Sequence, residues 1–148
     1  MMSTYETIPF RSEHTRALRL QPEQAHLVSV VAEPGYAEAL YENSLTAVSV
    51  FANGRIVACG GVIEVWQDRG FAWALISKGL PSQFIAIHRA ARLMIESCGL
   101  GRIEAYIDSG FAEGCRWMDL LGFELDTPKP MQRFANGRDC YLYSRVFE

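Results

Sequence analysis

Three runs of apolar residues in the middle of the chain have the composition of β-strands. TAVSVF and RIVACGGVIEV, residues 46–51 and 55–65, are rich in β-branched residues and flank the pair Asn53-Gly54. This pair is a strong hairpin signal, because both residues tolerate a positive φ. The third run, GFAWALIS at 70–77, is continuously apolar and bounded by turn residues. We therefore expect a hairpin followed by a central strand that is buried on both faces.

Apolar positions at helical spacing predict helices on either side of these strands. Between Ser12 and Leu45 the pattern is helical, and Pro22-Glu23 suits a first helical turn, where the fixed φ of proline and an acidic side chain are both favourable. A second helix follows the break at 78–81, with Ser82 as its N-cap. Its expected apolar face consists of Phe84, Ile87, His88, Ala91, Met94, Ile95 and Cys98.

Shorter patterns predict the remaining elements. The expected strands are Tyr5–Phe10 at an edge, RIEAYI at 102–107, FEL at 123–125, and a last hairpin of Met131–Phe134 with Cys140–Val146 across Asn136-Gly137. The stretch FAEGCRWMDLL at 111–121 predicts a helix that ends at Gly122, after a turn with capping residues at Asp108-Ser109-Gly110. The predicted order is β-αα-β-β-β-α-β-α-β-β, within one α/β domain that spans residues 1–148.

Composition excludes several classes of function. With 49% hydrophobic residues, the 148-residue chain is expected to fold rather than stay disordered. A net charge of -3 gives no clustered basic surface for nucleic acid, and no apolar stretch approaches the ~20 residues that cross a bilayer. The four cysteines, Cys59, Cys98, Cys115 and Cys140, are scattered, and no histidines cluster with them. We therefore expect reduced thiols, no metal site and a cytoplasmic protein.

Two long stretches resemble a known family. The stretch RIEAYIDSGFAEGCRWMDLLGFEL (102–125) is similar to the fifth strand, the fourth helix and the following Gly-Phe pair of the GNAT superfamily of N-acetyltransferases. YAEALYENSLTAVSVFANGRIVACGGV (36–62) resembles the helix, hairpin and third strand of the same fold. The resemblance covers residues 5–147, and it implies an α/β (α+β) fold with a mixed central sheet of about six to seven strands and about four helices.

A narrower resemblance concerns phage-encoded members of the superfamily, among them internal or early proteins of short-tailed phages. It is carried by Trp73, by the helix with Arg89 and Arg92, and by Arg116-Trp117 ahead of the Leu121-Gly122-Phe123 sequence. In a phage protein, the fold could serve to bind a host protein. That possibility stands beside catalysis, because a fold does not establish a function.

The resemblance also implies a place for acetyl-coenzyme A. In the family, backbone groups of the fourth strand hold pantetheine, and a glycine-rich loop with the next helix N-terminus holds the pyrophosphate. The corresponding backbone here belongs to Leu75, Ile76 and Ser77. The pyrophosphate contacts would come from Lys78, Gly79, Ser82 and Gln83. Only one glycine of the loop is present, and Pro81 removes a backbone donor.

The catalytic residues of the family are only partly present. Its usual tyrosine acid, four residues before the Gly-Phe glycine, is Met118 in this sequence. No carboxylate lies in the fourth strand, so Glu64, late in the third strand, is the candidate general base, acting directly or through water. Tyr141, or the neighbouring Tyr143, is the candidate acid. His88 is more simply a core histidine than a base.

The simpler interpretation of other polar residues is structural. Asp108 and Ser109 suit a helix N-cap, Arg89 and Arg92 suit a solvated face, and Lys78 is either a solvated lysine or a phosphate contact. Three functions remain: an acyl-coenzyme A-dependent N-acetyltransferase acting on an amine of a small molecule or protein, a non-catalytic protein that binds a host enzyme, and a virion component.

Overall fold

The computed structural model describes residues 4–79, 81–134 and 137–148, which include the seven strands of one mixed sheet. The strands hydrogen-bond in the order β1-β2-β3-β4-β5-β7-β6. The chain divides into two compact units, Met1–Ile63 with Trp73–Cys98, and Glu64–Ala72 with Gly99–Glu148. Strand β4 (Arg69–Ile76) contributes residues to both. The predicted class and strand number are confirmed.

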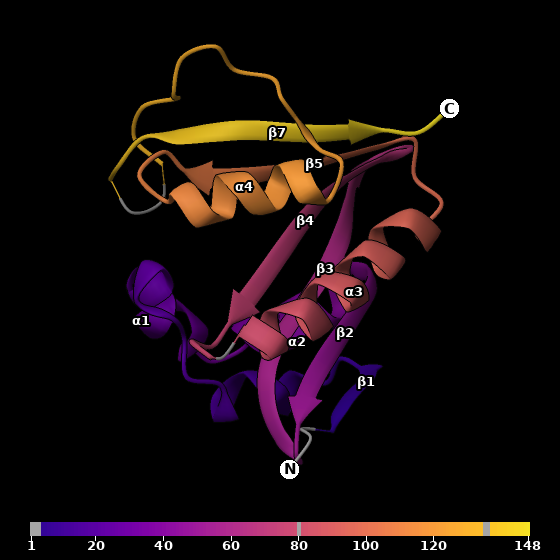
Figure 1. The fold of residues 1–148 in the computed structure, drawn as a ribbon, viewed down its shortest axis with the longest axis vertical. Helices are drawn as coiled ribbons and strands as arrows, with labels where there is room; N and C mark the ends of the chain where they lie inside the picture. Colours follow the sequence, from indigo (N-terminus) through magenta and orange to yellow (C-terminus); the bar gives the residue numbers. More distant parts are fainter. Residues whose placement is uncertain (1–3, 80, 135–136) are drawn as a thin grey trace. The chain divides into compact units, whose positions relative to one another are not determined.

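The strands of the first unit form around the predicted hairpin. Strand β2 (Ser44–Ala52) pairs antiparallel with β3 (Arg55–Trp66), and β1 (Tyr5–Pro9) pairs antiparallel with the other edge of β2. Asn53 and Gly54 adopt φ values of 51° and 80° in the turn, as their sequence predicted. Figure 1 shows this hairpin in magenta, with helix α3 (Pro81–Ser97) against it.

The helical segment before the hairpin is shorter and more broken than expected. It consists of two 3₁₀ helices, η1 (Ser12–Ala17) and η2 (Pro22–Leu27), and two α-helices, α1 (Val28–Val31) and α2 (Tyr36–Asn43). Pro22 does open a helical turn, although of 3₁₀ type. The expectation of helix up to Leu45 is wrong, because the chain is already extended at Ser44, where β2 begins to pair with β3.

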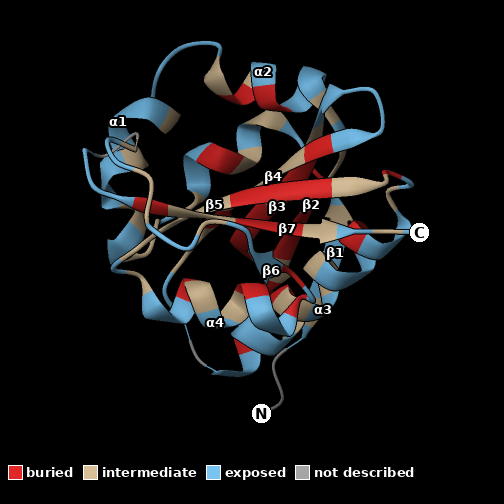
Figure 2. Cartoon of the chain, turned by 90° about the horizontal axis from the view of Figure 1, so that it is seen from above, coloured by how far each residue is buried: buried red, intermediate tan, exposed pale blue. Residues whose placement is uncertain are grey.

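The core of the first unit joins its strands and helices through apolar contacts. Phe10, Leu40, Ile56, Cys59 and Leu75 are buried together, and half-buried side chains surround them. The predicted two-sided burial of β4 is wrong, because only Gly70 and Leu75 of this strand are buried. On α3, the buried side chains are Gln83, Ile87, Met94 and Ile95, whereas Phe84, which we placed on the apolar face, is 40% exposed. Figure 2 colours the chain by burial, with buried residues in red and exposed ones in pale blue.

The close approach of β2, β3 and β4 depends on a glycine. A Cβ atom at Gly61 would lie 2.7 Å from the carbonyl oxygen of Thr46 and 2.8 Å from Nε1 of Trp73. Trp73 donates from Nε1 to Ser44 Oγ at 3.0 Å, and its ring packs edge-on against Phe10 with centroids 5.3 Å apart. Trp73 is therefore a packing residue of this unit.

The second unit contains the last strands and helix α4 (Ala112–Leu120). Strand β5 (Arg102–Asp108) pairs in parallel with β4 over Arg69–Phe71 and antiparallel with β7 (Cys140–Val146), and β6 (Glu124–Leu125) pairs with the other edge of β7. Helix α4 packs on β5, as Figure 1 shows in orange. The predicted helix end is confirmed: Gly122 has a φ of 84°, and the N–H of Phe123 donates to the carbonyl of Met118 at 2.9 Å.

The predicted last hairpin is largely wrong. Only an isolated bridge joins Met131 to Cys140, and the longer partner of β7 is β5, over seven residue pairs from Arg102 to Asp108. The N–H of Phe134 donates to the carbonyl of Arg138, which keeps a turn at this place, whereas Asn136 lies outside the described residues. Pairing with β5 supplies β7 with backbone hydrogen bonds along its whole length, so tertiary pairing rather than the local turn signal determines this strand.

Candidate functional site

The two edges of β4 have different partners near its C-terminal end. Ser77 lies on the side of β3, where its N–H and its Oγ both donate to the carbonyl of Val57, at 2.9 and 3.0 Å. Because successive backbone groups of a strand point to opposite edges, Ala74 and Ile76 use the other edge. On this outer edge, β4 pairs with β5 over Arg69–Phe71, at the start of the strand.

A glutamine side chain pairs with the outer edge. Gln24 donates from Nε2 to the carbonyl of Ala74 at 2.7 Å, and its Oε1 accepts a hydrogen bond from the N–H of Ile76 at 2.9 Å. The N–H of Gln21 donates to the carbonyl of Ile76 at 2.8 Å, and Leu20 forms an antiparallel bridge with Ser77. The backbone groups of Ile76 and Ser77, which the sequence-based hypothesis left available to a ligand, therefore have partners within the chain.

The loop after β4 is covered by a side chain from α3. Gln83 is buried, and its Nε2 lies 3.3 Å from both the carbonyl oxygen and Oγ of Ser77. A Cβ atom at Gly79 would lie 2.2 Å from the carboxamide of Gln83, so this glycine is required for the side chain to fold over the loop. Lys78 and Gly79 are exposed, and Leu80 lies outside the described residues.

Ser82 does not have the predicted capping role. Helix α3 begins at Pro81, so Ser82 lies inside its first turn, and its Oγ is hydrogen-bonded to the hydroxyl of Tyr5 at 2.9 Å. The first backbone N–H groups of an α-helix have no partner within the helix, so those of Ser82 and Gln83 belong to the positive end of the helix dipole. Lys78 is the nearest cationic side chain in sequence.

The structure places Glu64 and Tyr141, the candidate base and acid, at opposite ends of β5. Glu64 is exposed, and its Oε2 accepts from the N–H of Asp68, whose carbonyl binds the N–H of Arg102 at the start of β5. Tyr141 pairs with Ile107 near the end of this strand. Five residues of extended chain span about 16 Å. The two residues therefore do not form one acid–base pair.

Two further residues of the second unit bear on the choice of the predicted acid. Tyr143 is buried, and burial raises the pKa of its hydroxyl, with a hydrogen bond to Cys115 as the next cause. Met118, at the position where the family resemblance expects a tyrosine acid, is also buried. Tyr141 is half-buried and packs edge-on against Tyr143 with ring centroids 6.5 Å apart. Tyr141 is thus the more exposed of the two tyrosines.

The remaining candidates mostly have structural surroundings. His88 stacks on Phe84 with centroids 6.2 Å apart, and partial burial lowers its pKa, followed by the charge of Arg92. Arg92 pairs with Glu96 one helical turn away. Asp108 accepts from the N–H of Gly110 at 2.8 Å, which confirms the predicted turn. The predicted capping role of Asp108 and Ser109 is wrong, because the N-cap of α4 is Phe111, which makes no side-chain cap hydrogen bond.

The cysteines at 59, 98, 115 and 140 are free thiols. Burial raises the pKa of Cys59 to about 11, so this thiol is poorly nucleophilic at neutral pH. Among residues 4–79, 81–134 and 137–148, no three His, Cys, Asp or Glu side chains gather as metal ligands would, and no helix is long and apolar enough to cross a membrane.

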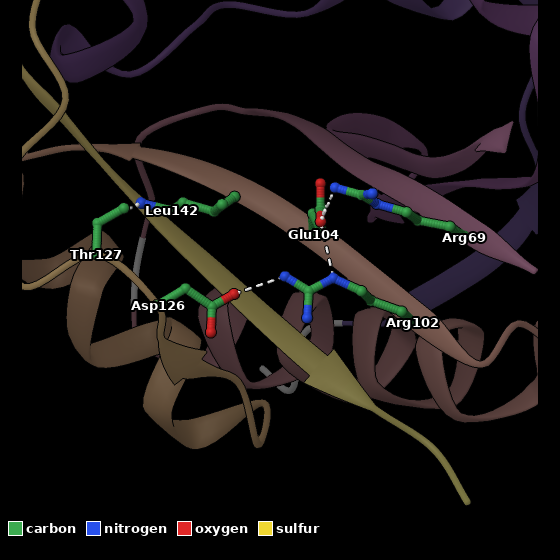
Figure 3. A network of polar contacts seen from close by, with 6 residues as sticks. All are labelled: Arg69, Arg102, Glu104, Asp126, Thr127 and Leu142. Carbon is green, nitrogen blue, oxygen red and sulfur yellow. Dashed lines mark hydrogen bonds and ion pairs between the residues drawn. The ribbon is translucent and has the colours of Figure 1, made fainter.

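The most buried carboxylate belongs to a network of ion pairs at the start of β5. Glu104 accepts through Oε2 from Arg69 at 2.5 Å and from Nε of Arg102 at 2.8 Å (Figure 3). Arg102 also donates to Asp126 at 2.7 Å, so the network joins β4, β5 and the residue after β6. Beside it the N–H of Leu142 donates to Thr127 Oγ1 at 3.1 Å. Each carboxylate has its partners, which indicates a structural role.

Comparison with solved structures shows which fold these elements form. No protein-family model and no curated protein sequence matches the chain. Ard1 from Thermoplasma volcanium superposes with a TM-score of 0.77 at 11% identity, covering 97% of this chain and 98% of that one. A GNAT-family acetyltransferase from Streptococcus pneumoniae gives 0.68 at 13%, covering 98% and 100%. The chain has the GNAT fold.

A third GNAT-like structure contains a ligand. The yncA protein from Salmonella typhimurium, determined with its cofactor acetyl-coenzyme A, gives a TM-score of 0.71 at 13% identity, covering 98% of this chain and 95% of that one. At such low identity the likeness concerns the fold alone. It confirms the fold that the resemblance implied, and nothing in these comparisons bears on an origin in a phage.

Sequence reasoning missed Gln21, Gln24 and Ala74. The two glutamines lie 50 or more residues before the β4 residues to which they are hydrogen-bonded, in a segment whose pattern indicated only a helix. The sequence contains two glutamines one turn apart, but no local rule assigns the side chain of Gln24 or the backbone N–H of Gln21 to a strand edge.

Proposed function

We propose that this chain is an acyl-coenzyme A-dependent N-acyltransferase that acts on a primary amine and has a weakened cofactor site. One observation carries the proposal: the outer edge of β4 offers the Ala74 carbonyl and the Ile76 N–H as a matched acceptor and donor for an amide, and it holds the carboxamide of Gln24 in this way. The pantetheine part of coenzyme A contains secondary amides with the same two groups. The resemblance to the family, in which the fourth strand holds pantetheine, supports placing them at this edge.

The residues present fit the two parts of coenzyme A unequally. The β4 edge fits pantetheine, because its backbone groups already bind an amide. The pyrophosphate would lie against Lys78, Gly79 and the first turn of α3, where the positive end of the helix dipole favours anions. That part fits less well, because Gln83 covers the loop and Pro81 lacks an N–H. Coenzyme A would supply the activated acyl thioester.

The reaction needs proton transfers at two atoms. The amine must lose a proton as its nitrogen bonds to the thioester carbonyl carbon, and the sulfur that leaves must gain one. The candidate for the first transfer is Glu64, through water, since it is exposed, and the candidate for the second is Tyr141. Because they lie at opposite ends of β5, we propose that only one of them acts at the reacting bond, that solvent takes the other role, and that transfer is therefore slow.

Isothermal titration of the purified protein with acetyl-coenzyme A tests the proposal. Two lost charge-assisted hydrogen bonds at ~1.5–3 kcal/mol each would weaken binding ~10²–10⁴-fold relative to an intact loop, so we expect a micromolar to millimolar Kd. Lys78→Ala should weaken binding further. Lys129→Ala is the matched control, because it removes the same charge from an exposed residue of the other unit. Absence of heat up to millimolar ligand would contradict the proposal.

A non-catalytic interaction protein, for example a phage protein that binds a host enzyme, is the second candidate. Buried Met118 at the tyrosine position and the separation of Glu64 from Tyr141 favour it. The resemblance of Trp73 and Arg116-Trp117 to phage proteins supports the host-binding version. Binding of acetyl-coenzyme A without turnover on any amine would favour this candidate, whereas measurable acylation of an amine would exclude it.

A further inference from the structure

The segment Leu20–Gln24 occupies the outer edge of β4 as an additional strand would. It supplies three hydrogen bonds to the strand: two through the carboxamide of Gln24 and one from the backbone N–H of Gln21. The backbone bridge between Leu20 and Ser77 sets its direction as antiparallel. In chemical terms the Gln24 side chain is a primary amide whose carbonyl and N–H are bound in the manner of a peptide group.

A ligand amide cannot share this arrangement. The N–H of Ile76 carries one proton and donates it to Oε1 of Gln24 at 2.9 Å. A second acceptor could take this proton only if Gln24 moved away. The carbonyl of Ile76 is likewise engaged by Gln21. An extended amide ligand on the outer edge of β4 and the Leu20–Gln24 segment are therefore mutually exclusive.

The segment is held weakly enough to be displaced. No residue of η2 is buried, and Pro22, Glu23, Ala25 and His26 are exposed. Its apolar anchors are Leu20 and Leu27, which are half-buried against the core. Segments with few buried apolar contacts open at a small fraction of the free energy of global unfolding. The hydrogen bonds to β4 are thus a large part of what holds this segment in place.

We propose that the Leu20–Gln24 segment is an internal competitor of acyl-coenzyme A, which closes the β4 edge in the free protein and is released when the cofactor binds. This inference rests on the proposed function, because it concerns the same edge. It predicts that cofactor binding is weak in part because the β4 edge must first open. The apparent Kd is then the intrinsic Kd divided by the fraction of molecules in which the edge is open.

The variant Gln24→Met tests the competition. Methionine keeps the length of the side chain and removes both hydrogen bonds, so the edge should open more often and acetyl-coenzyme A should bind about 5–30-fold more tightly. His26→Ala is the matched control, since it changes an exposed residue of the same helix and should bind as the wild type does. Equal affinity of Gln24→Met and wild type would overturn the inference while leaving the proposed function intact.

Hydrogen exchange on the wild-type protein gives a second measurement that needs no variant. The amide of Gln21 is hydrogen-bonded to β4 in the free protein, so residues 20–27 should exchange faster at saturating acetyl-coenzyme A than without it. Unchanged or slower exchange in the bound state would contradict displacement. If neither wild type nor variant binds acetyl-coenzyme A, the proposed function fails, and the competitor fails with it.

Discussion

Arg102 donates from Nε to the carboxylate of Glu104 at 2.8 Å, although the two residues are separated by only one position on β5. Residues two apart on a strand share a face, so this ion pair follows from the period of the strand. Glu104 is 5% exposed, whereas both of its arginine partners keep contact with solvent. Loss of the arginine partners would therefore leave a buried charge unpaired, whereas loss of Glu104 would leave two arginines that solvent still reaches.

We expect Glu104→Gln to lower the free energy of unfolding by about 1–3 kcal/mol, because it replaces charge-assisted hydrogen bonds at a buried site with neutral ones. Urea denaturation measures the change. Glu113→Gln is the control. The pair of Glu113 with Arg116 is exposed and 3.9 Å long, so this variant should leave the free energy of unfolding almost unchanged. Equal losses in both variants would show that burial of Glu104 does not strengthen its pairs.

Truncation of Phe123 should be among the most damaging single changes in the second unit. The side chain is 4% exposed and follows Gly122, whose φ of 84° ends α4. We expect Phe123→Ala to cost about 3–5 kcal/mol of unfolding free energy, as for other buried phenylalanines. Leu125→Ala, at a 47% exposed position two residues later, should cost far less. A loss below ~1 kcal/mol for Phe123→Ala would contradict its packing role.

Stability should fall as the pH drops below about 6.5, the ordinary histidine value. Burial lowers the pKa of His14, whose Nδ1 lies 2.7 Å from Ser49 Oγ and accepts from the N–H of Arg11. A lowered folded-state pKa means that the unfolded chain takes up the proton first. The contribution of neutral His14 to stability is therefore complete above pH 6.5 and is lost as the pH falls toward the folded-state pKa.

Comparison of urea unfolding at pH 7.5 and 5.5 measures this loss. Glu13 and Arg11 also face His14, and the pKa of His88 is lowered by burial as well, so His14→Gln should reduce the difference between the two pH values without removing it. The exposed His26→Gln variant serves as the control and should keep the wild-type difference. A His14→Gln protein with the full wild-type difference would assign the loss to other groups.

Acetyl transfer by the wild-type protein should be slow and should not depend on a proton from residue 118. Met118 is buried and cannot donate one, and general acid catalysis is typically worth 10²–10⁴-fold. Met118→Leu, which conserves volume, should therefore leave kcat unchanged. A fast enzyme would mean that another acid operates, and Tyr141→Phe would then be the first variant to measure.

Local patterns predicted most of the elements because each depends on neighbours in sequence. Asn53-Gly54 turns as expected, β5 has the predicted start, and Gly122 ends α4, since positive φ values and strand period are properties of a few adjacent residues. The errors occur where residues far away in the sequence determine the local structure. Ser44 pairs with β3 instead of continuing a helix, and Cys140–Val146 pairs along its length with β5, while the expected hairpin keeps only the bridge of Cys140 to Met131 and a turn.

The order of strands and helices and the hairpin were determined by the sequence alone, because they need only composition and spacing. The absent glycine loop was likewise visible in the sequence, through its resemblance to the family. Tertiary structure decided which groups are accessible. It placed Glu64 and Tyr141 at opposite ends of β5, and it brought Gln24 to the edge of β4 across 50 residues of chain. A hydrogen bond between groups so far apart in sequence forms only after the core has closed the loop between them, so no local pattern encodes it.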